Sequence, residues 1–306
     1  MSFTSNVKTE ISKLNITEAE KISELSSIVA NSSQIMDTIK ISTENASVAR
    51  RIYNLVREIY KIVPKVIVRK GYNYNKSYIY IIEAKYDIKL FLNYLGMDEV
   101  GIPLEYVVAD DNLIRSYLRG LFISSGSIND PKKSRYHLEF LVQTYEYAEF
   151  VKKLLNAYDL NSKILKRDNK YMIYIKEAEK IGDFLRIINA PQAVLYYEDI
   201  RIYRDHKNMT NRLNNCEQAN VDKIIETASK QVKYINILKE KDLYDLLSER
   251  DKIAAEYRIK YPETSLQELA EIISIETNNP ITKSGLHHRL NKIKALASKG
   301  DKKWNV

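Results

Sequence analysis

The sequence has little of what disulfide-bonded, secreted and membrane-spanning proteins require. Its 306 residues include one cysteine, Cys216, which excludes an intramolecular disulfide and favours a reducing cytosol. No run of about 18 apolar residues occurs, which argues against a membrane span. The opening residues, MSFTSNVKTEISKL, lack the apolar stretch of a signal peptide. Glycine and proline are scarce, with eight and six residues, while 44% of the chain is hydrophobic. This composition predicts two or three folded domains in a cytoplasmic protein.

Basic residues outnumber acidic ones. The 48 lysines and arginines against 40 aspartates and glutamates give a formal net charge of +8. Such a balance favours polyanionic partners, chiefly nucleic acid. The 23 tyrosines accompany many isoleucines, lysines and asparagines. We interpret them as a consequence of AT-rich coding rather than as an aromatic binding site.

The stretch from Tyr117 to Ile128, YLRGLFISSGSI, has the pattern of a helix that ends in a glycine turn. Leu118, Gly120 and Leu121 supply the small and apolar positions that let two helices pack closely. We expect Gly126 to release the chain into a polar turn and then a strand.

The same pattern recurs with a shift of about 93 residues. Each copy, at about 16–97 and about 110–190, predicts a helix, a strand, a helix, two strands and a helix, with the potential for four strands. The segments that match are Leu25–Ser33 with Leu118–Gly126, Ser77–Glu83 with Lys170–Lys176, and Leu92–Met97 with Leu185–Ala190. We interpret the repeat as a duplication that gives an α+β domain with pseudo-twofold symmetry.

The strand predictions depend on alternation and β-branched content. Single strands are expected at Ile35–Ser42 and Tyr136–Gln143. Two hairpins are expected, one pairing Lys65–Lys70 with Ser77–Glu83 and one pairing Ser162–Arg167 with Lys170–Lys176 across Asp168-Asn169. The duplicated domain is expected at 1–207. A polar linker follows at 208–221, and an all-helical domain at 222–306 begins with a long helix at Val221–Glu240.

Two helices near the end of the chain have the pattern of a helix-turn-helix at about 264–298. Ser265 and Glu268 have capping-box spacing at the start of the first helix. Asn278-Asn279-Pro280 ends it, and Thr282 can cap the second helix. From Ile281 to Lys303 seven basic residues and one acid give a local charge of 7 − 1 = +6.

The outward face of this second helix is the predicted DNA-binding site, because polar and basic side chains there can reach base edges and phosphates. The turn is longer than the usual three or four residues of this motif. His287 and His288 are adjacent and point in different directions, so a shared metal ion is not expected. The predicted contact residues are Thr282, Lys283, Ser284, His287, His288, Arg289, Lys292 and Lys294.

These pieces together resemble the WhiA family. The resemblance rests on the degenerate LAGLIDADG-type repeat, the junction NRLNNCEQAN at Asn211–Asn220 and the segment SGLHHRLNKI, and it covers nearly the whole chain. It implies a two-lobed domain like that of LAGLIDADG homing endonucleases, followed by a helix-turn-helix domain. It also implies a bacterial transcription regulator of sporulation, cell division or chromosome segregation, bound to duplex DNA at the nucleoid.

The resemblance also raises the question of nuclease activity. Homing endonucleases hold divalent cations with carboxylates at the ends of both central helices. Here the matching positions carry Ser32 and Ser125. Asp37, Asp110, Asp111 and Asp130 lie nearby but outside the motif, where surface or capping roles are expected. We therefore predict no catalytic residues, no metal site, no cofactor and no small-molecule substrate.

Two alternatives stay open. The chain could be an active endonuclease with displaced acids, or an adaptor whose lobes bind a transcription or cell-division protein. The first domain has basic residues of its own on comparable strands, Lys65, Arg69, Lys163 and Lys166. They could make secondary DNA contacts like those of an endonuclease saddle, or be a solvated sheet face.

Overall fold

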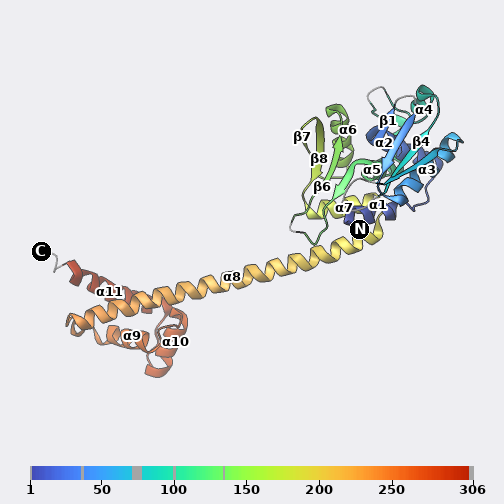
Figure 1. Cartoon of the computed structure of the whole chain (residues 1–306). Coiled ribbons are helices and arrows are strands. Elements are labelled where there is room, and N and C mark those ends of the chain that lie inside the picture. The colour runs from blue at the N-terminus through green and yellow to red at the C-terminus, as the bar shows by residue number, and fades with distance from the viewer. Residues whose placement is uncertain (1, 36–37, 71–77, 99–100, 134, 303–306) are drawn as a thin grey trace. The chain divides into compact units, whose positions relative to one another are not determined.

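A computed structural model describes residues 2–35, 38–70, 78–98, 101–133 and 135–302. The chain divides into two compact units, Met1–Asp205 and His206–Val306, each with its own hydrophobic core. Figure 1 labels the helices and some of the strands. In the described part of the chain, no helix is both long and apolar enough to cross a membrane.

The first unit contains the predicted duplication. One repeat consists of α2 (Glu18–Ser32), β1 (Ser33–Ile35), β2 (Ile39–Thr43), α3 (Ala46–Tyr60), β3 (Lys65–Lys70), β4 (Tyr78–Ala84) and α4 (Ile88–Tyr94). The other consists of α5 (Asp111–Ser125), β5 (Gly126–Ile128), β6 (Leu138–Val142), α6 (Tyr145–Asn156), β7 (Lys163–Arg167), β8 (Lys170–Ile175) and α7 (Ala178–Ile187). The two antiparallel sheets have matching orders, β1-β2-β4-β3 and β5-β6-β8-β7. The α+β fold class and both predicted hairpins are confirmed.

The predicted order of elements within each repeat is wrong at one point. Two strands, not one, follow each central helix, and the region predicted as a single strand at Ile35–Ser42 contains the end of β1 and most of β2. No polar turn separates α5 from its strand, since Gly126 is the first residue of β5. Strands of three residues, SQI and GSI, are too short and too polar for alternation to reveal them.

The central helices α2 and α5 pack against each other at the seam between the repeats. A Cβ atom added to Gly120 would lie 2.3 Å from the carbonyl oxygen of Glu24 and 3.1 Å from Cβ of Ser27. The close approach expected from the small residue at Gly120 is therefore confirmed. Around it, Leu118, Leu121 and Leu25 are fully buried.

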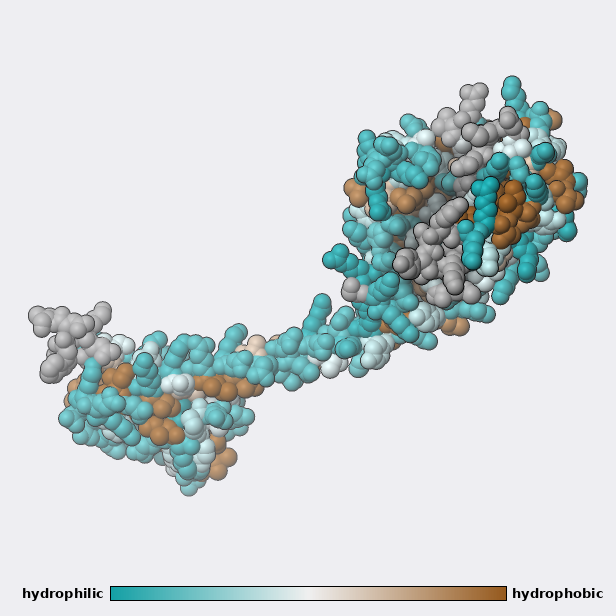
Figure 2. Space-filling model, in the orientation of Figure 1, coloured by the Kyte–Doolittle hydropathy of each residue, from teal (hydrophilic) through white to brown (hydrophobic). Residues whose placement is uncertain are grey.

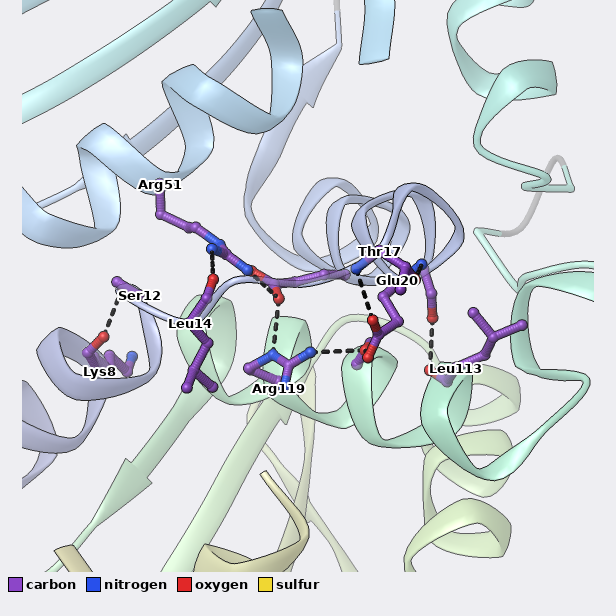
Figure 3. A network of polar contacts seen from close by, with 11 residues as sticks. Lys8, Ser12, Leu14, Thr17, Glu20, Arg51, Leu113 and Arg119 are labelled. Carbon is purple, nitrogen blue, oxygen red and sulfur yellow. Dashed lines mark hydrogen bonds and ion pairs between the residues drawn. The ribbon is translucent and has the colours of Figure 1, made fainter. Parts of the chain in front are cut away.

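A buried ionic network crosses this seam. The Glu24 side chain is 0% exposed, and its two carboxylate oxygens each lie 2.8 Å from an arginine Nε, that of Arg51 on α3 and that of Arg119 on α5. Figure 3 shows the two arginines approaching from opposite sides, with Arg51 also donating to the carbonyl of Leu14. Arg119 donates a further bond of 2.7 Å to Ser116. The network thus ties α2, α3 and α5 together without leaving the Glu24 charge unpaired.

Helix α1 (Phe3–Ile11) was not predicted, although Phe3, Val7 and Ile11 recur at helical spacing and are all buried. It joins distant parts of the first unit. The Glu10 carboxylate accepts bonds of 2.7 and 3.0 Å from the backbone N–H groups of Gln192 and Ala193, which open helix α8. This contact places an anion at the positive end of α8, where it satisfies two free donors.

Helix α8 runs from Pro191 to Glu240, so the helix predicted at Val221–Glu240 is only its last part. The predicted linker at 208–221 is helical and lies inside α8. The second unit continues with the short 3₁₀ segment η2 (Tyr244–Leu246), α9 (Glu249–Lys260), α10 (Leu266–Thr277) and α11 (Lys283–Lys302). Its core consists of buried aliphatic side chains from α8 to α11.

Gly120→Ala tests the tight seam. Because the new methyl group would meet backbone rather than a flexible side chain, we expect a loss of about 2–3 kcal/mol in the free energy of unfolding of the first unit. Differential scanning calorimetry would measure it. Gly285→Ala is the control in the second unit, since its Cβ would meet only side-chain atoms, at 3.3 Å or more, rather than backbone, and alanine favours a helix. An unchanged transition for Gly120→Ala would contradict the seam geometry.

Lys8→Met tests a charge that burial disfavours. The Lys8 amine lies 5.6 Å from the centre of the Phe122 ring, and burial lowers its pKa to about 8. Because the folded-state pKa is below the ordinary one, the penalty is complete below pH 8 and vanishes as the pH rises toward 10.5. We expect the variant to be more stable by about 1–3 kcal/mol at neutral pH, with a gain that shrinks on alkalinisation.

Chemical denaturation at a series of pH values would measure this gain. Lys13→Met, at an exposed position just after α1, is the control. A stability gain for Lys8→Met that is the same at every pH would refute the assignment.

Candidate nucleic-acid interface

Helices α10 and α11 and the turn between them form the predicted helix-turn-helix. The Ser265 hydroxyl accepts from the Glu268 N–H and the Glu268 carboxylate accepts from the Ser265 N–H, so the predicted capping box is confirmed. The backbone bond from Ser265 and the bond to its side chain hold the pKa of Glu268 below its ordinary range. Asn278 ends α10 in the left-handed conformation, with φ of 51°.

The turn is held by side chains rather than by its own backbone. The Ile281 N–H donates 2.9 Å to the Ser274 hydroxyl, which in turn donates to the Ala270 carbonyl. Thr282 caps α11 as predicted, because its hydroxyl accepts 3.1 Å from the Gly285 N–H. These bonds fix the start of α11 against the end of α10.

Helix α11 has a buried side and a solvent side. Leu286, Leu290, Ile293 and Ala297 recur every three or four residues and are at most 3% exposed. With about 3.6 residues in each turn, the opposite side presents Ser284, His288, Asn291 and Ala295, and all four are exposed. Lys292 and Lys299 flank that side and are exposed as well.

The structure separates the eight predicted contact residues into groups. Ser284, His288 and Lys292 lie on or beside the outermost side of α11. Lys283, His287 and Lys294 lie on one flank, where the Lys294 amine is 6.0 Å from the centre of the Tyr234 ring of α8. Thr282 precedes the helix. Arg289 differs from the other seven, which are all exposed.

Arg289 points toward helix α9. Its side chain is 24% exposed, and its Nη1 lies 3.9 Å from a carboxylate oxygen of Asp251, whose side chain is 8% exposed. The other oxygen of Asp251 accepts 2.6 Å from the Ser248 hydroxyl, which caps α9. Arg289 therefore has a structural contact in addition to any contact that it makes with DNA.

Sequence reasoning missed Asn291 and Lys299. The Asn291 amide lies 2.9 Å from His287 Nε2, one helical turn earlier. Its spacing of three or four residues from His287 and His288 was a signal available in the sequence. An asparagine amide can pair with an adenine edge in the major groove.

The four basic residues proposed for the first unit do not share one side of the sheets. Lys65 and Arg69 of β3 are an even number of residues apart, so they point to the same side. Lys163 and Lys166 of β7 are an odd number apart and point to opposite sides. Lys166 pairs with Tyr171, on the side of the buried Ile173. Arg167, rather than Lys166, shares the outer side with Lys163.

Acidic and aliphatic side chains reduce the positive character of both outer sheet faces. Glu83 lies 3.6 Å from Lys40, and Glu139 lies 4.0 Å from Arg167. Leu165 is 52% exposed beside Lys163 and Arg167. Figure 2 shows hydrophobic residues among hydrophilic ones on the visible face of this unit. The exposed basic residues of α11 are less mixed with acids.

The hydroxyl at the end of helix α5 is already hydrogen-bonded. Ser125 is the last residue of α5, and its hydroxyl donates 3.2 Å to the Leu121 carbonyl one turn earlier. Ser32 is the last residue of α2. Asp110 caps α5, Asp111 pairs with Arg115 at 2.6 Å, and Asp130 accepts from the Lys132 N–H. Asp37 lies outside the described residues.

Residues of metal-ligand type do not cluster in the described ranges: no three histidines, cysteines or acids there are placed to hold one ion. The carboxylates described above near the seam form ion pairs with arginines, cap a helix or accept a bond in a turn.

Comparisons with known proteins identify the family to which this chain is similar. Three family models match, the WhiA N-terminal LAGLIDADG-like domain at residues 19–98, the WhiA LAGLIDADG-like domain at 114–207 and the WhiA C-terminal HTH domain at 210–297. The "Probable cell division protein WhiA" of Staphylococcus epidermidis is 40% identical, over 98% of this chain and 97% of that protein. The Staphylococcus haemolyticus protein of the same name is 41% identical over the same shares.

Solved structures agree. The full-length DUF199/WhiA structure from Thermatoga maritima matches with a TM-score of 0.59 and 26% identity, over 98% of this chain and 99% of that one. The N-terminal LAGLIDADG domain of DUF199/WhiA matches with a TM-score of 0.53 and 27% identity, over 61% and 90%. Fold and site thus define a protein with a duplicated LAGLIDADG-type domain and a C-terminal helix-turn-helix domain. The chain belongs to the WhiA family, as its sequence predicted.

Arg289→Ala tests the structural contact of that side chain. Removing the guanidinium leaves the buried Asp251 carboxylate without its cation, and we expect a loss of roughly 1–2 kcal/mol in stability, because the pair is long and partly exposed. Thermal unfolding would measure it, with the fully outward His288→Ala as control. A stable Arg289→Ala variant with reduced DNA affinity would instead make Arg289 a pure contact residue.

Proposed function

We propose that this chain is a non-catalytic, sequence-specific DNA-binding protein that regulates transcription through α11. The observation that carries the proposal is the solvent side of α11, with polar and basic side chains exposed above a fully buried aliphatic stripe. A helix of this kind fits the major groove of B-form DNA, which is about 12 Å wide. The match of residues 210–297 to a family HTH domain supports it.

The exposed residues of α11 suggest two roles. Ser284, His288 and Asn291 have short side chains with donors and acceptors, and we propose that they read base edges. Lys292 and Lys299 carry mobile charges beside them, and we propose that they neutralise phosphates and fix the register of the helix on DNA. Thr282, Lys283, His287 and Lys294 would contact the backbone from the flank.

The absence of catalysis is proposed from the ends of the seam helices. Hydroxyls at Ser32 and Ser125 do not supply the negative charge that holds Mg²⁺ against water. The nearest buried acid, Glu24, is already neutralised by two arginines. The seam is therefore proposed to serve packing alone.

The names of the curated relatives support a role in cell division. We propose that this chain acts on genes of division, chromosome segregation or sporulation, that it works at the nucleoid in the cytoplasm, and that transcription or division proteins are its partners. The outer sheet faces, with Lys65, Arg69, Lys163 and Arg167, are proposed as secondary DNA contacts, and Lys166 is set aside because it points to the other side of its sheet.

Lys292→Ala in the full chain tests the proposed interface. We expect weaker binding of duplex DNA and a fall of about one in the slope of log affinity against log salt, since one phosphate contact is lost. His288→Ala should reduce discrimination between selected and scrambled duplexes by about 1–3 kcal/mol. Fluorescence anisotropy at several salt concentrations measures both.

Lys252→Ala is the matched control, because this lysine is already paired with Glu249 at 3.1 Å. Wild-type DNA binding by both α11 variants would contradict the proposed interface. Specific double-strand cleavage of a plasmid library by the pure protein with Mg²⁺ or Mn²⁺ would contradict the proposed absence of nuclease activity.

A further inference from the structure

The second unit has a cavity of about 280 Å³. Helix α11, which is proposed to contact DNA bases, contributes only its first residue to the lining. The cavity lies between α8, α9 and the starts of α10 and α11. We call it the Arg258 cavity. Three cationic side chains line it, and no acid is among its lining residues in the described part of the chain. The residues that matter are Lys223, Thr227, Arg258, Thr264, Ser265 and Lys283.

Arg258 is the unusual member. It is 1% exposed, the largest side chain of the fully buried set. Its Nη1 donates 2.8 Å to the Thr264 carbonyl and 3.3 Å to that of Tyr261. Its Nε is buried without a hydrogen-bond partner, and none of the ion pairs of the described residues includes Arg258. Burial lowers the pKa of its guanidinium, although an arginine keeps its proton in proteins.

A buried cation without a carboxylate is costly, and native proteins pair such charges or bring an anion to them. Neutral carbonyls satisfy some donors of Arg258 but contribute no negative charge. Arg258 lies in the last turn of α9, where the partial negative charge of the helix end also favours a cation. No carboxylate of the described residues completes the compensation. An anion in the cavity would provide it.

The rim of the cavity has the groups to hold such an anion. Lys223 of α8 and Lys283 of α11 are exposed, and neither forms an ion pair with any described residue. Thr227 adds a hydroxyl, whereas that of Thr264 already donates 2.9 Å to the Tyr261 carbonyl. The N–H of Ser265 is already used in the capping box of α10, so the site rests on side chains rather than on a free helix end. Each liquid water occupies roughly 30 Å³, so the cavity can take a phosphate group with ordered water.

We propose that the Arg258 cavity is a phosphate-binding site, with Lys223 and Lys283 as direct ligands above the buried charge of Arg258. The proposal rests on the proposed DNA-binding function for its main occupant, a backbone phosphate. Lys283 opens α11, so a phosphate held there borders the groove that α11 would enter. Lys223 lies outside the helix-turn-helix and extends the contact to α8. A phosphate on a small molecule would satisfy the same chemistry.

Lys223→Ala in the full chain tests the DNA source. The salt slope of duplex binding should fall by about 0.9, the value for one phosphate. Affinity should fall severalfold and equally for selected and scrambled duplexes, because a phosphate contact carries no sequence information. Lys223→Glu should weaken binding further. Lys230→Ala is the control on the same helix, since that lysine is paired with Glu226 at 2.6 Å.

Inorganic phosphate tests the other source. Titration against the full chain, at ionic strength matched with chloride, should shift the amide resonances of Thr264 to Gln267 and raise the melting temperature of the wild type but not of Lys223→Ala. Phosphate binding with an unchanged salt slope for Lys223→Ala would support the site with a free phosphate compound as occupant.

Failure of this site and failure of the proposed function give different results. If Lys292→Ala weakens DNA binding while Lys223→Ala changes neither DNA nor phosphate binding, the cavity proposal is overturned and the interface stands. If phosphate binds through Lys223 but the full chain binds no duplex, the site stands and the proposed function falls.

Discussion

The Glu24 carboxylate, held between Arg51 and Arg119, is the interaction on which the first unit depends. It is completely buried, and each of its oxygens lies 2.8 Å from a guanidinium nitrogen. Removing one partner of such a pair leaves an uncompensated buried charge and costs about 3–5 kcal/mol. The close packing at Gly120 places the carbonyl of the same glutamate against the neighbouring helix. Charge and packing therefore reinforce each other at one point of the seam.

This arrangement is consistent with the proposal that the LAGLIDADG-type scaffold is kept for packing rather than for nuclease chemistry. Glu24 lies in the interior of α2, about two turns before Ser32, which ends the helix. There it neutralises arginines instead of facing solvent and a metal ion. Polar groups that are free for a ligand are found in the second unit, on the solvent side of α11 and around Arg258. There Lys292, Lys299 and Arg258 form no ion pair with any residue that the structure describes.

Much of this could be predicted from the sequence, because its signals are local. The capping box at Ser265, the turn at Asn278 and the hairpin at Asp168 depend on neighbouring residues. The duplication was visible as repeated patterns. The three-residue strands were missed, since three residues are too few to show an alternating pattern.

The candidate site was predicted less completely, because it depends on contacts between residues that are far apart in the sequence. A helix of about 3.6 residues per turn identifies an outward side, but not which neighbouring helix a flanking residue meets. Arg289 reaches Asp251, some 38 positions earlier in the chain, and Lys294 lies over Tyr234. Arg258 looked like an ordinary helix residue, and only the packing of four helices shows that its charge is buried.

Photocrosslinking tests the central claim most directly. The full chain would be bound to duplexes that carry photoreactive thymine analogues, and the crosslinked peptides would be identified by mass spectrometry. We expect crosslinks in α11, concentrated at Ser284, His288 and Asn291. Crosslinks confined to β3, β7 and the other sheet strands of the first unit, with none in α11, would contradict it.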